Sequence, residues 1–316
     1  MTFEKEIIYW LQSFRSSFLD SLFQFFTMFG EEMVVIAVLG LIYWSIDKKV
    51  GERLGITVFI SLGLNSVLKF IFMRPRPFVV DESIVNLRPE TAGGYSMPSG
   101  HAQSASTVFF GAYQFLKKRF LLIFAIIITI LVSISRMYIG VHYLSDVVVG
   151  SLLGIIITYL LYRWLGKKED LKLLYNIILI ASIVTLIFVF TYNAIKLTEE
   201  TFNSQLYYFN VEALAKMIGT LVGFVIGIKI ERKYVNFINH KNILKNLIRF
   251  IIGVIVVMAV RLGLKELFHL IVNPENLVDN QLFLSIIAGL LDFLRYVIMV
   301  IIGLGIYPIL FKKINI

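Results

Sequence analysis

The sequence has no cysteine among its 316 residues and few charged residues. Without cysteine the chain can form no disulfide, no thiol nucleophile and no thiolate metal site. Charged residues make up 16% of the chain, whereas soluble domains contain about 25%. The 58% of hydrophobic residues and the mean hydropathy of +0.82 therefore indicate a membrane protein rather than a soluble one.

Apolar runs recur along the chain, each close to the roughly 20 residues that a bilayer-spanning helix needs. They predict an all-α, polytopic membrane helical bundle with about nine transmembrane helices. The predicted spans are 33–46, 54–72, 99–116, 120–134, 146–162, 173–192, 214–230, 247–264 and 282–310. We divide the chain into residues 1–30, a core of residues 31–193, and a C-terminal transmembrane extension of unknown role, residues 194–316.

The first thirty residues lack the long apolar stretch and the small-residue cleavage site of a signal peptide. We therefore expect them to remain in the mature protein. Large apolar side chains recur there at helical spacing, at Leu11, Phe14, Phe18, Leu22, Phe25 and Phe29. Polar residues lie between them, and the segment is predicted to be one interfacial amphipathic helix.

The formal charge of +9 does not indicate nucleic acid binding, because the basic residues form short clusters between apolar runs. Every second loop is basic, as expected for the cytoplasmic side of a membrane protein. The N-terminal helix and the loops 73–98, 135–145 and 194–213 are then predicted to lie outside. The stretch 69–88 is also basic although it is predicted to lie outside, so its cations need a reason other than topology.

Three short polar segments lie near the predicted outer ends of spans. They are the run from Lys69 to Arg76 and Pro77, the run Pro98-Ser99-Gly100-His101, and Ser135-Arg136 followed by His142 and Asp146. These segments resemble the three-part signature of the type 2 phosphatidic acid phosphatase superfamily, KxxxxxxRP, PSGH and SRxxxxxHxxxD, without a substitution. The resemblance covers roughly residues 30–193, and it implies a membrane lipid phosphatase.

The chemistry of the two histidines agrees with this resemblance. His142 and Asp146 are four residues apart, so a helix places them on one face. A carboxylate at Nδ1 fixes the tautomer and leaves Nε2 to attack phosphorus, which makes His142 the predicted nucleophile. His101 can protonate the departing lipid oxygen and then activate water, as a general acid and base.

The remaining motif residues suit a phosphate. Lys69, Arg76 and Arg136 supply three cations for the non-bridging oxygens, so neither a metal nor another cofactor is expected. Ser99 and Gly100 lie where a helix begins, and backbone N–H groups there can face the phosphate. Any of these residues alone would more often be structural, and it is the joint pattern that favours catalysis.

Other polar residues have two open interpretations. Ser135 is as plausible a helix cap as a phosphate contact. Arg74 is an additional cation that could reach the substrate, and Asn65 could orient Lys69 or bridge helices. Asp292 and Arg295 are costly in lipid, and they are expected to form an ion pair with each other or with Arg261, with contact to a lipid headgroup as the alternative. Small residues at four-residue spacing, Gly150 with Gly154 and the run Gly219, Gly223 and Gly227, favour packing within one chain over a dimer interface. His240 and His269 match no motif and are read as incidental.

The leading hypothesis is metal-independent hydrolysis of a lipid phosphate through a phosphohistidine, at the extracytoplasmic face of the cell membrane. The resemblance implies undecaprenyl diphosphate, phosphatidate, phosphatidylglycerol phosphate or a sphingoid phosphate as substrate. Two alternatives remain open, a lipid phosphotransferase with the same intermediate and a lipid transporter. The expected partners are the substrate lipid and the bilayer, with a homodimer possible and nucleic acid not expected.

Overall fold

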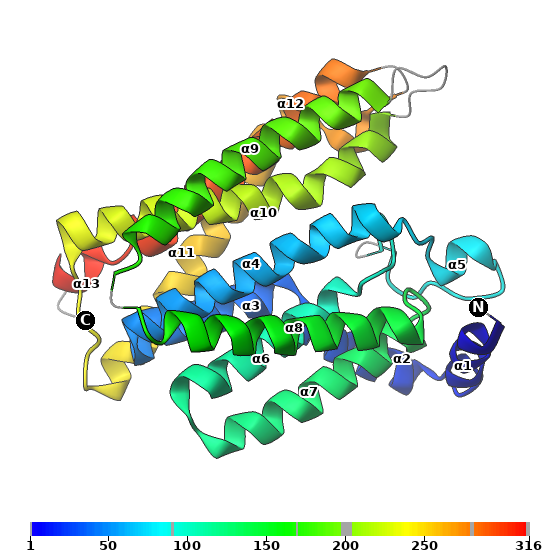
Figure 1. Cartoon of the computed structure of the whole chain (residues 1–316), viewed down its shortest axis with the longest axis horizontal. Coiled ribbons are helices and arrows are strands. Elements are labelled where there is room, and N and C mark those ends of the chain that lie inside the picture. Colours follow the sequence, from blue (N-terminus) through cyan, green and yellow to red (C-terminus); the bar gives the residue numbers. More distant parts are fainter. Residues whose placement is uncertain (1, 90–91, 169, 197–203, 279–280, 314–316) are drawn as a thin grey trace. The chain divides into compact units, whose positions relative to one another are not determined.

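The computed structural model describes residues 2–89, 92–168, 170–196, 204–278 and 281–313. Within these ranges the regular structure is entirely helical, which confirms the predicted all-α class (Figure 1). The chain forms two compact units, Met1–Leu39 with Lys49–Lys168, and Gly40–Lys48 with Glu169–Ile316. The predicted domain boundaries after residues 30 and 193 remain predictions.

The first unit contains all three motif segments. Its helices are α1 (Thr2–Ser13), α2 (Ser17–Thr27), the 3-10 turn η1 (Met28–Gly30), α3 (Glu32–Gly40), α4 (Lys48–Phe72), α5 (Pro77–Val80), α6 (Gly100–Leu116), α7 (Arg119–Tyr138) and α8 (Leu144–Leu165). Helix α6 packs against both α7 and α8, and these three helices run side by side in Figure 1. The polar face of α6 is buried in this packing, because Gln103, Ser104 and Thr107 are nearly inaccessible to solvent.

The second unit contains the C-terminal helices. They are the π-helical turn η2 (Leu41–Ile46), α9 (Lys172–Lys196), α10 (Ser204–Ile230), η4 (Glu231–Val235), α11 (Ile243–His269), η5 (Pro274–Asn276), α12 (Leu282–Ile301), η6 (Ile302–Ile306) and α13 (Ile309–Lys313). Helices α10 and α12 pack closely together. Part of the predicted outer loop 194–213, residues 197–203, lies outside the described residues.

Helices occupy all nine predicted spans, but fewer have the length and composition of a membrane span. Five helical stretches among the described residues are long and apolar enough, namely Arg119–Tyr138, Leu144–Leu165, Val211–Val235, Ile243–Asn276 and Leu282–Phe311. A sixth results if Ser17–Gly30 and Glu32–Ile46, which meet at a bend of 51°, form one span. The multi-pass membrane class is therefore supported, whereas the count of nine spans remains a prediction.

The N-terminal segment differs from the single helix that its apolar spacing predicts. It forms two helices, α1 and α2, that are separated at residues 14–16. The backbone of Ser16 is extended, and its side chain accepts a hydrogen bond from the amide of Leu19. An N-cap of this kind starts a new helix. The apolar spacing continues across the break, which is why it did not reveal the separation.

The small-residue pairs pack within the chain. A Cβ atom on Gly150 would lie 2.6 Å from the carbonyl oxygen of Ser99, and one on Gly154 would lie 2.7 Å from that of Gln103. Both glycines thus bring α8 against α6. In the second unit, the glycines at four-residue spacing on α10 pack closely against α12 and η6. They are Gly219, Gly223 and Gly227. The favoured interpretation, packing between helices of one chain, is confirmed for both sets.

Candidate active site

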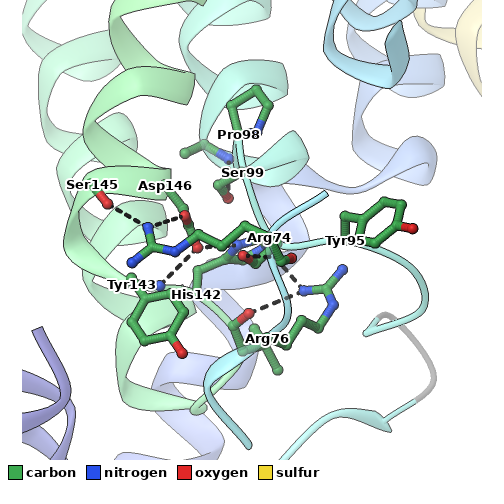
Figure 2. A network of polar contacts seen from close by, with 12 residues as sticks. Arg74, Arg76, Tyr95, Pro98, Ser99, His142, Tyr143, Ser145 and Asp146 are labelled. Atoms are coloured by element: carbon green, nitrogen blue, oxygen red, sulfur yellow. Dashed lines mark hydrogen bonds and ion pairs between the residues drawn. The ribbon is translucent and has the colours of Figure 1, made fainter. Parts of the chain in front are cut away.

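The structure brings the three motif segments together at one end of the first unit. The predicted site residues are Lys69 at the end of α4, Arg76 just before α5, Ser99, Gly100 and His101 at the start of α6, Arg136 in the last turn of α7, His142 in the loop before α8, and Asp146 in the first turn of α8. Polar contacts join four of these residues, Arg76, Ser99, His142 and Asp146, into one network (Figure 2).

His142 and Asp146 form a buried pair. The Nδ1 atom of His142 lies 3.3 Å from Oδ2 of Asp146, and both side chains are almost inaccessible to solvent. The same carboxylate oxygen accepts a hydrogen bond of 2.9 Å from the amide of Tyr143, so it also caps α8. Because two bonds hold this oxygen, the carboxylate can fix both the tautomer and the orientation of the imidazole.

Arg76 faces the other nitrogen of His142. Its Nη1 atom lies 3.3 Å from Nε2 of His142. Three backbone carbonyls accept hydrogen bonds from the same guanidinium group, those of Gly93 at 2.7 Å, Gly94 at 3.0 Å and Val141 at 3.1 Å. Carbonyl oxygens can hold a cation without neutralising it, so Arg76 keeps its positive charge for an anion beside His142.

The charges around His142 favour its neutral form. Burial lowers the pKa of His142 well below its ordinary value, and the cations Arg76, Arg136 and Lys69 lower this pKa further. Burial also lowers the pKa of Arg76 to about 10, although the charge of Asp146 opposes this shift. At neutral pH the imidazole therefore has a free lone pair while the guanidinium group beside it remains charged.

Lys69 and Arg136 complete the set of cations. The ammonium group of Lys69 donates a hydrogen bond of 2.5 Å to the carbonyl of Tyr95. Arg136 is fully buried, and its Nη1 atom donates to the hydroxyl of Thr27 at 2.9 Å. Both cations act electrostatically on His142. Binding of a phosphate by these two cations together with Arg76 stays a prediction of the motif.

The PSGH segment is tied to α8. The amide of Ser99 donates a hydrogen bond of 2.9 Å to the carbonyl of Asp146. The hydroxyl of Ser99 accepts from the amide of Ala102 and caps α6. Gly100 follows at the first helical position, and a Cβ atom there would lie 3.4 Å from the side-chain oxygen of Asn65. These contacts hold His101 in the first turn of α6.

Arg74 lies against the carboxylate of Asp146. Its Nη1 atom is 2.8 Å from Oδ1 of Asp146 and 2.6 Å from the hydroxyl of Ser145, as Figure 2 shows. Its Nη2 atom forms an ion pair of 2.6 Å with Glu4 of α1, and the guanidinium group lies 3.9 Å from the ring centre of Tyr143. The role that the structure gives this additional cation is therefore to hold Asp146.

For the other residues with two interpretations, the contacts favour a structural role. The hydroxyl of Ser135 donates to the carbonyl of Val132 in its own helix. The amide group of Asn65 donates to Gln103 at 2.8 Å and so bridges helices. In the second unit, Asp292 pairs with Arg295 at 2.5 Å, as expected. No group of three or more potential metal ligands of the His, Cys, Asp or Glu type occurs within the described ranges.

Three residues beside the site were missed at the sequence level, namely Glu4, Thr27 and Glu31. Glu4 accepts hydrogen bonds from Ser145 and Arg74. Glu4 and Thr27 come from the N-terminal segment, whose apolar spacing predicts contact with a membrane surface, and Glu31 follows it directly. The polar residues between the apolar ones gave no specific signal, because their partners lie far along the chain.

Comparisons with known proteins identify relatives of this chain. The sequence model of the PAP2 superfamily matches residues 53–170, and that of the PAP2 superfamily phosphatase, transmembrane extension, matches residues 215–316. The undecaprenyl-diphosphatase of Sulfolobus acidocaldarius is 37% identical over 145 residues, covering 45% of this chain and 68% of that protein. Sphingosine-1-phosphate phosphatase 2 of Homo sapiens is 31% identical over 147 residues, covering 45% of this chain and 36% of that protein.

A solved structure is also similar. The first transmembrane PAP2 type phosphatidylglycerolphosphate phosphatase from Bacillus subtilis matches with a TM-score of 0.45 and 25% identity, covering 54% of this chain and 88% of that chain. This chain spans about two thirds of the archaeal relative's length and little more than a third of the human relative's.

Proposed function

The chain belongs to the PAP2 superfamily, whose phosphatases hydrolyse phosphoric esters, and from this premise we propose that it removes phosphate from a membrane lipid through a phosphohistidine at His142. The observation that carries the proposal is the position of the His142 imidazole. Its Nδ1 atom faces the carboxylate of Asp146 and its Nε2 atom faces the guanidinium group of Arg76, each at 3.3 Å. A nucleophile needs this combination of an oriented ring and an adjacent phosphate-binding cation.

The reaction has two steps. In the first, Nε2 of His142 forms a bond to phosphorus while the bond from phosphorus to the lipid oxygen breaks, and His101 gives that oxygen a proton. In the second, water attacks the phosphohistidine, His101 accepts a proton from the water, and inorganic phosphate leaves. Lys69, Arg76 and Arg136 hold the non-bridging oxygens in both steps. The residues of this chain supply all the charges that these steps use.

The proposed substrate is an isoprenoid diphosphate or a phospholipid phosphomonoester. The apolar helices allow a lipid tail to remain in hydrocarbon while its headgroup reaches the site. The archaeal relative bears the name undecaprenyl-diphosphatase, which supports the first of these classes. The arrangement of basic loops supports a site at the extracytoplasmic face of the cell membrane.

A panel of purified lipid phosphates tests the proposal. The full chain in detergent micelles is mixed with undecaprenyl diphosphate, phosphatidate, phosphatidylglycerol phosphate or a sphingoid phosphate, and phosphate release is measured with and without EDTA. We expect release from at least one lipid, insensitive to EDTA, and a loss of about 10³-fold or more in His142→Ala. His240→Ala is the matched control and is expected to retain activity.

Two outcomes would contradict parts of this proposal. Release from no lipid by the folded wild-type protein, or undiminished release by His142→Ala, would overturn the reaction. With a radiolabelled phosphate, label that appears in a second lipid instead of free phosphate would indicate phosphotransfer. A Ser83→Cys protein tests the membrane face, because an impermeant thiol reagent should modify it from outside intact cells, and protection there would reverse the orientation.

A further inference from the structure

The segment between α2 and α3 packs directly on the backbone of His101. A Cβ atom on Gly30 would lie 2.6 Å from the carbonyl oxygen of His101 and 2.8 Å from its Cα atom. Only glycine fits at such a distance from backbone atoms. Thr27, the last residue of α2, accepts a hydrogen bond from Arg136. The segment Thr27 to Glu31 thus contacts both a phosphate-binding cation and the proposed general acid.

Glu31 brings a carboxylate to the imidazole of His101. Its Oε1 atom lies 3.9 Å from Nε2 of His101, and each side chain is 18% exposed. That Nε2 atom is buried and makes no hydrogen bond within the described part of the chain. In proteins without substrate, catalytic hydrogen bonds are often long and shorten on binding. A small rotation of either side chain would join the two groups.

The carboxylate itself is held in place. Its Oε1 atom forms an ion pair of 2.7 Å with Nη2 of Arg88. The guanidinium group of Arg88 also donates a hydrogen bond of 3.3 Å to the carbonyl of Gln24 in α2. Arg88 thereby ties Glu31 to the N-terminal helices, in the way that Arg74 ties Asp146 to Glu4.

The charges around His101 give this carboxylate a function. His101 must carry a proton on both ring nitrogens before the lipid oxygen leaves, yet its burial and the cations Arg136 and Arg76 disfavour that charge. Positive neighbours disfavour an imidazolium, and a carboxylate favours it. Glu31 is the anion whose charge acts on His101 against those cations.

We propose that Glu31 is the positioning residue of His101, so that each histidine of the site has its own carboxylate. This inference rests on the proposed function of His101 as general acid and base. Glu31 accepts the Nε2 proton, which leaves Nδ1 to exchange protons with the substrate. In the first step the Nδ1 proton passes to the lipid oxygen, and in the second step Nδ1 takes a proton from the attacking water. The Nε2 proton stays between the imidazole and Glu31 throughout.

The experiment compares two substrates in Glu31→Gln. Decyl phosphate has an alkoxide leaving group that needs a proton, whereas p-nitrophenyl phosphate has a leaving group that departs without one. We expect turnover of decyl phosphate to fall about 30-fold and that of p-nitrophenyl phosphate less than about threefold, because general acid catalysis contributes about 10²-fold or more only where a proton is needed. Glu31→Asp should recover part of the activity. Glu82→Gln, at an exposed site in the loop after α5, is the matched control and should behave as wild type.

A double variant separates this function from a merely structural one. In a His101→Ala background, Glu31→Gln should cause no further loss, since groups that act as a unit are not additive. Equal losses on both substrates, or a further loss in the His101→Ala background, would overturn the inference.

A measurement without turnover separates this inference from the proposed function. The sequence has four histidines, so the ring ¹⁵N signals of a labelled sample can be assigned by substitution. The pH at which the His101 signals change should move to lower pH in Glu31→Gln and stay in place in Glu82→Gln. An unmoved signal would refute the role of Glu31 even in an active enzyme. Release of phosphate from neither substrate by the wild-type protein would instead refute the proposed function.

Discussion

The two histidines of the site obtain their carboxylates from different parts of the chain. Asp146 lies one helical turn after His142, and the two are joined across 3.3 Å. Glu31 comes from the segment before α3, and its carboxylate lies 3.9 Å from His101. The first pair is encoded by a short spacing across the start of α8, because His142 lies in the loop before that helix and not on its face, where the sequence predicts it. The second exists only because the N-terminal segment folds back onto α6.

The two pairs also differ in how tightly they are held. Oδ2 of Asp146 accepts the amide of Tyr143, and Oδ1 pairs with Arg74, so both oxygens are fixed. Glu31 has an ion pair with Arg88 and a longer approach to its histidine. A nucleophile must meet phosphorus along one line and profits from a rigid ring. His101 exchanges a proton first with the lipid oxygen and then with the attacking water, so its ring needs more freedom to rotate.

The largest expected effect concerns the first pair. Asp146→Asn keeps a side-chain oxygen that can accept the hydrogen bond from the amide of Tyr143, but it removes the charge that orients His142. We expect phosphate release to fall about 10⁴-fold, since replacing the orienting carboxylate of a hydrolase triad by an amide has an effect of this order. The loss should be equal for decyl phosphate and p-nitrophenyl phosphate, because both need the nucleophile. Glu31→Gln should instead discriminate between them.

Asp170→Asn serves as the control, at an exposed carboxylate that pairs with Lys172. It should retain full activity. If Asp146→Asn still hydrolysed p-nitrophenyl phosphate at the wild-type rate, it would behave as Glu31→Gln is expected to. The proposed difference between the two carboxylates would then be wrong.

The part of this site that the sequence predicts is the part coded by short spacing. Lys69 with Arg76, Ser99 to His101, and His142 with Asp146 each lie within one motif, and the structure places them together. The fold class follows equally directly from the apolar runs. Helix α6 shows the limit of prediction from apolar runs. Its polar face is buried against other helices of the bundle, which hydropathy alone does not indicate.

What the sequence does not predict depends on long-range contacts. Arg74 looks like a further phosphate ligand in the sequence, yet in the structure its charge is used by Asp146 and Glu4. Glu31 looks like one of several carboxylates before an apolar run. Neither role follows from periodicity, because each depends on how the N-terminal helices pack against α6, α7 and α8.

The next effect concerns the rigidity of the first pair. Arg74→Met removes the cation that holds Oδ1 of Asp146 across 2.8 Å, where the carboxylate is fully buried. We expect kcat to fall about 30-fold with little change in KM, because loss of one partner of a buried pair leaves an uncompensated charge. Arg15→Met breaks the exposed pair with Asp20 and is the control, expected to change activity less than about twofold. An increase in KM at constant kcat would mean that Arg74 binds substrate instead.

The third effect concerns the segment that carries Glu31. Gly30→Ala forces the segment away from the backbone of His101, since a Cβ atom there would lie 2.6 Å from a carbonyl oxygen. We expect a loss of about tenfold on decyl phosphate and a smaller one on p-nitrophenyl phosphate, together with a lower melting temperature, because overpacking costs about 1–3 kcal/mol. Gly63→Ala in α4, where nothing lies within 4 Å of the added atom, should retain activity and melt at the same or a higher temperature. Equal behaviour of the two variants would show that the contact at Gly30 does not matter.

The smallest expected effect is a shift in the pH at which the two histidines titrate. Removal of Arg76 should raise this pH for His142, and removal of the Glu31 charge should lower it for His101. Burial and the cation Arg76 lower the pKa of His142, so the neutral ring that attacks phosphorus persists below the ordinary histidine value of about 6.5. Arg76→Gln removes a cation and should raise this pKa, so that the ring ¹⁵N signals of His142 change at higher pH than in wild type. Glu31→Gln removes an anion and should move the His101 signals to lower pH. Shifts of both histidines in the same direction would mean that they share one electrostatic environment, and the separation into two carboxylate pairs would fail.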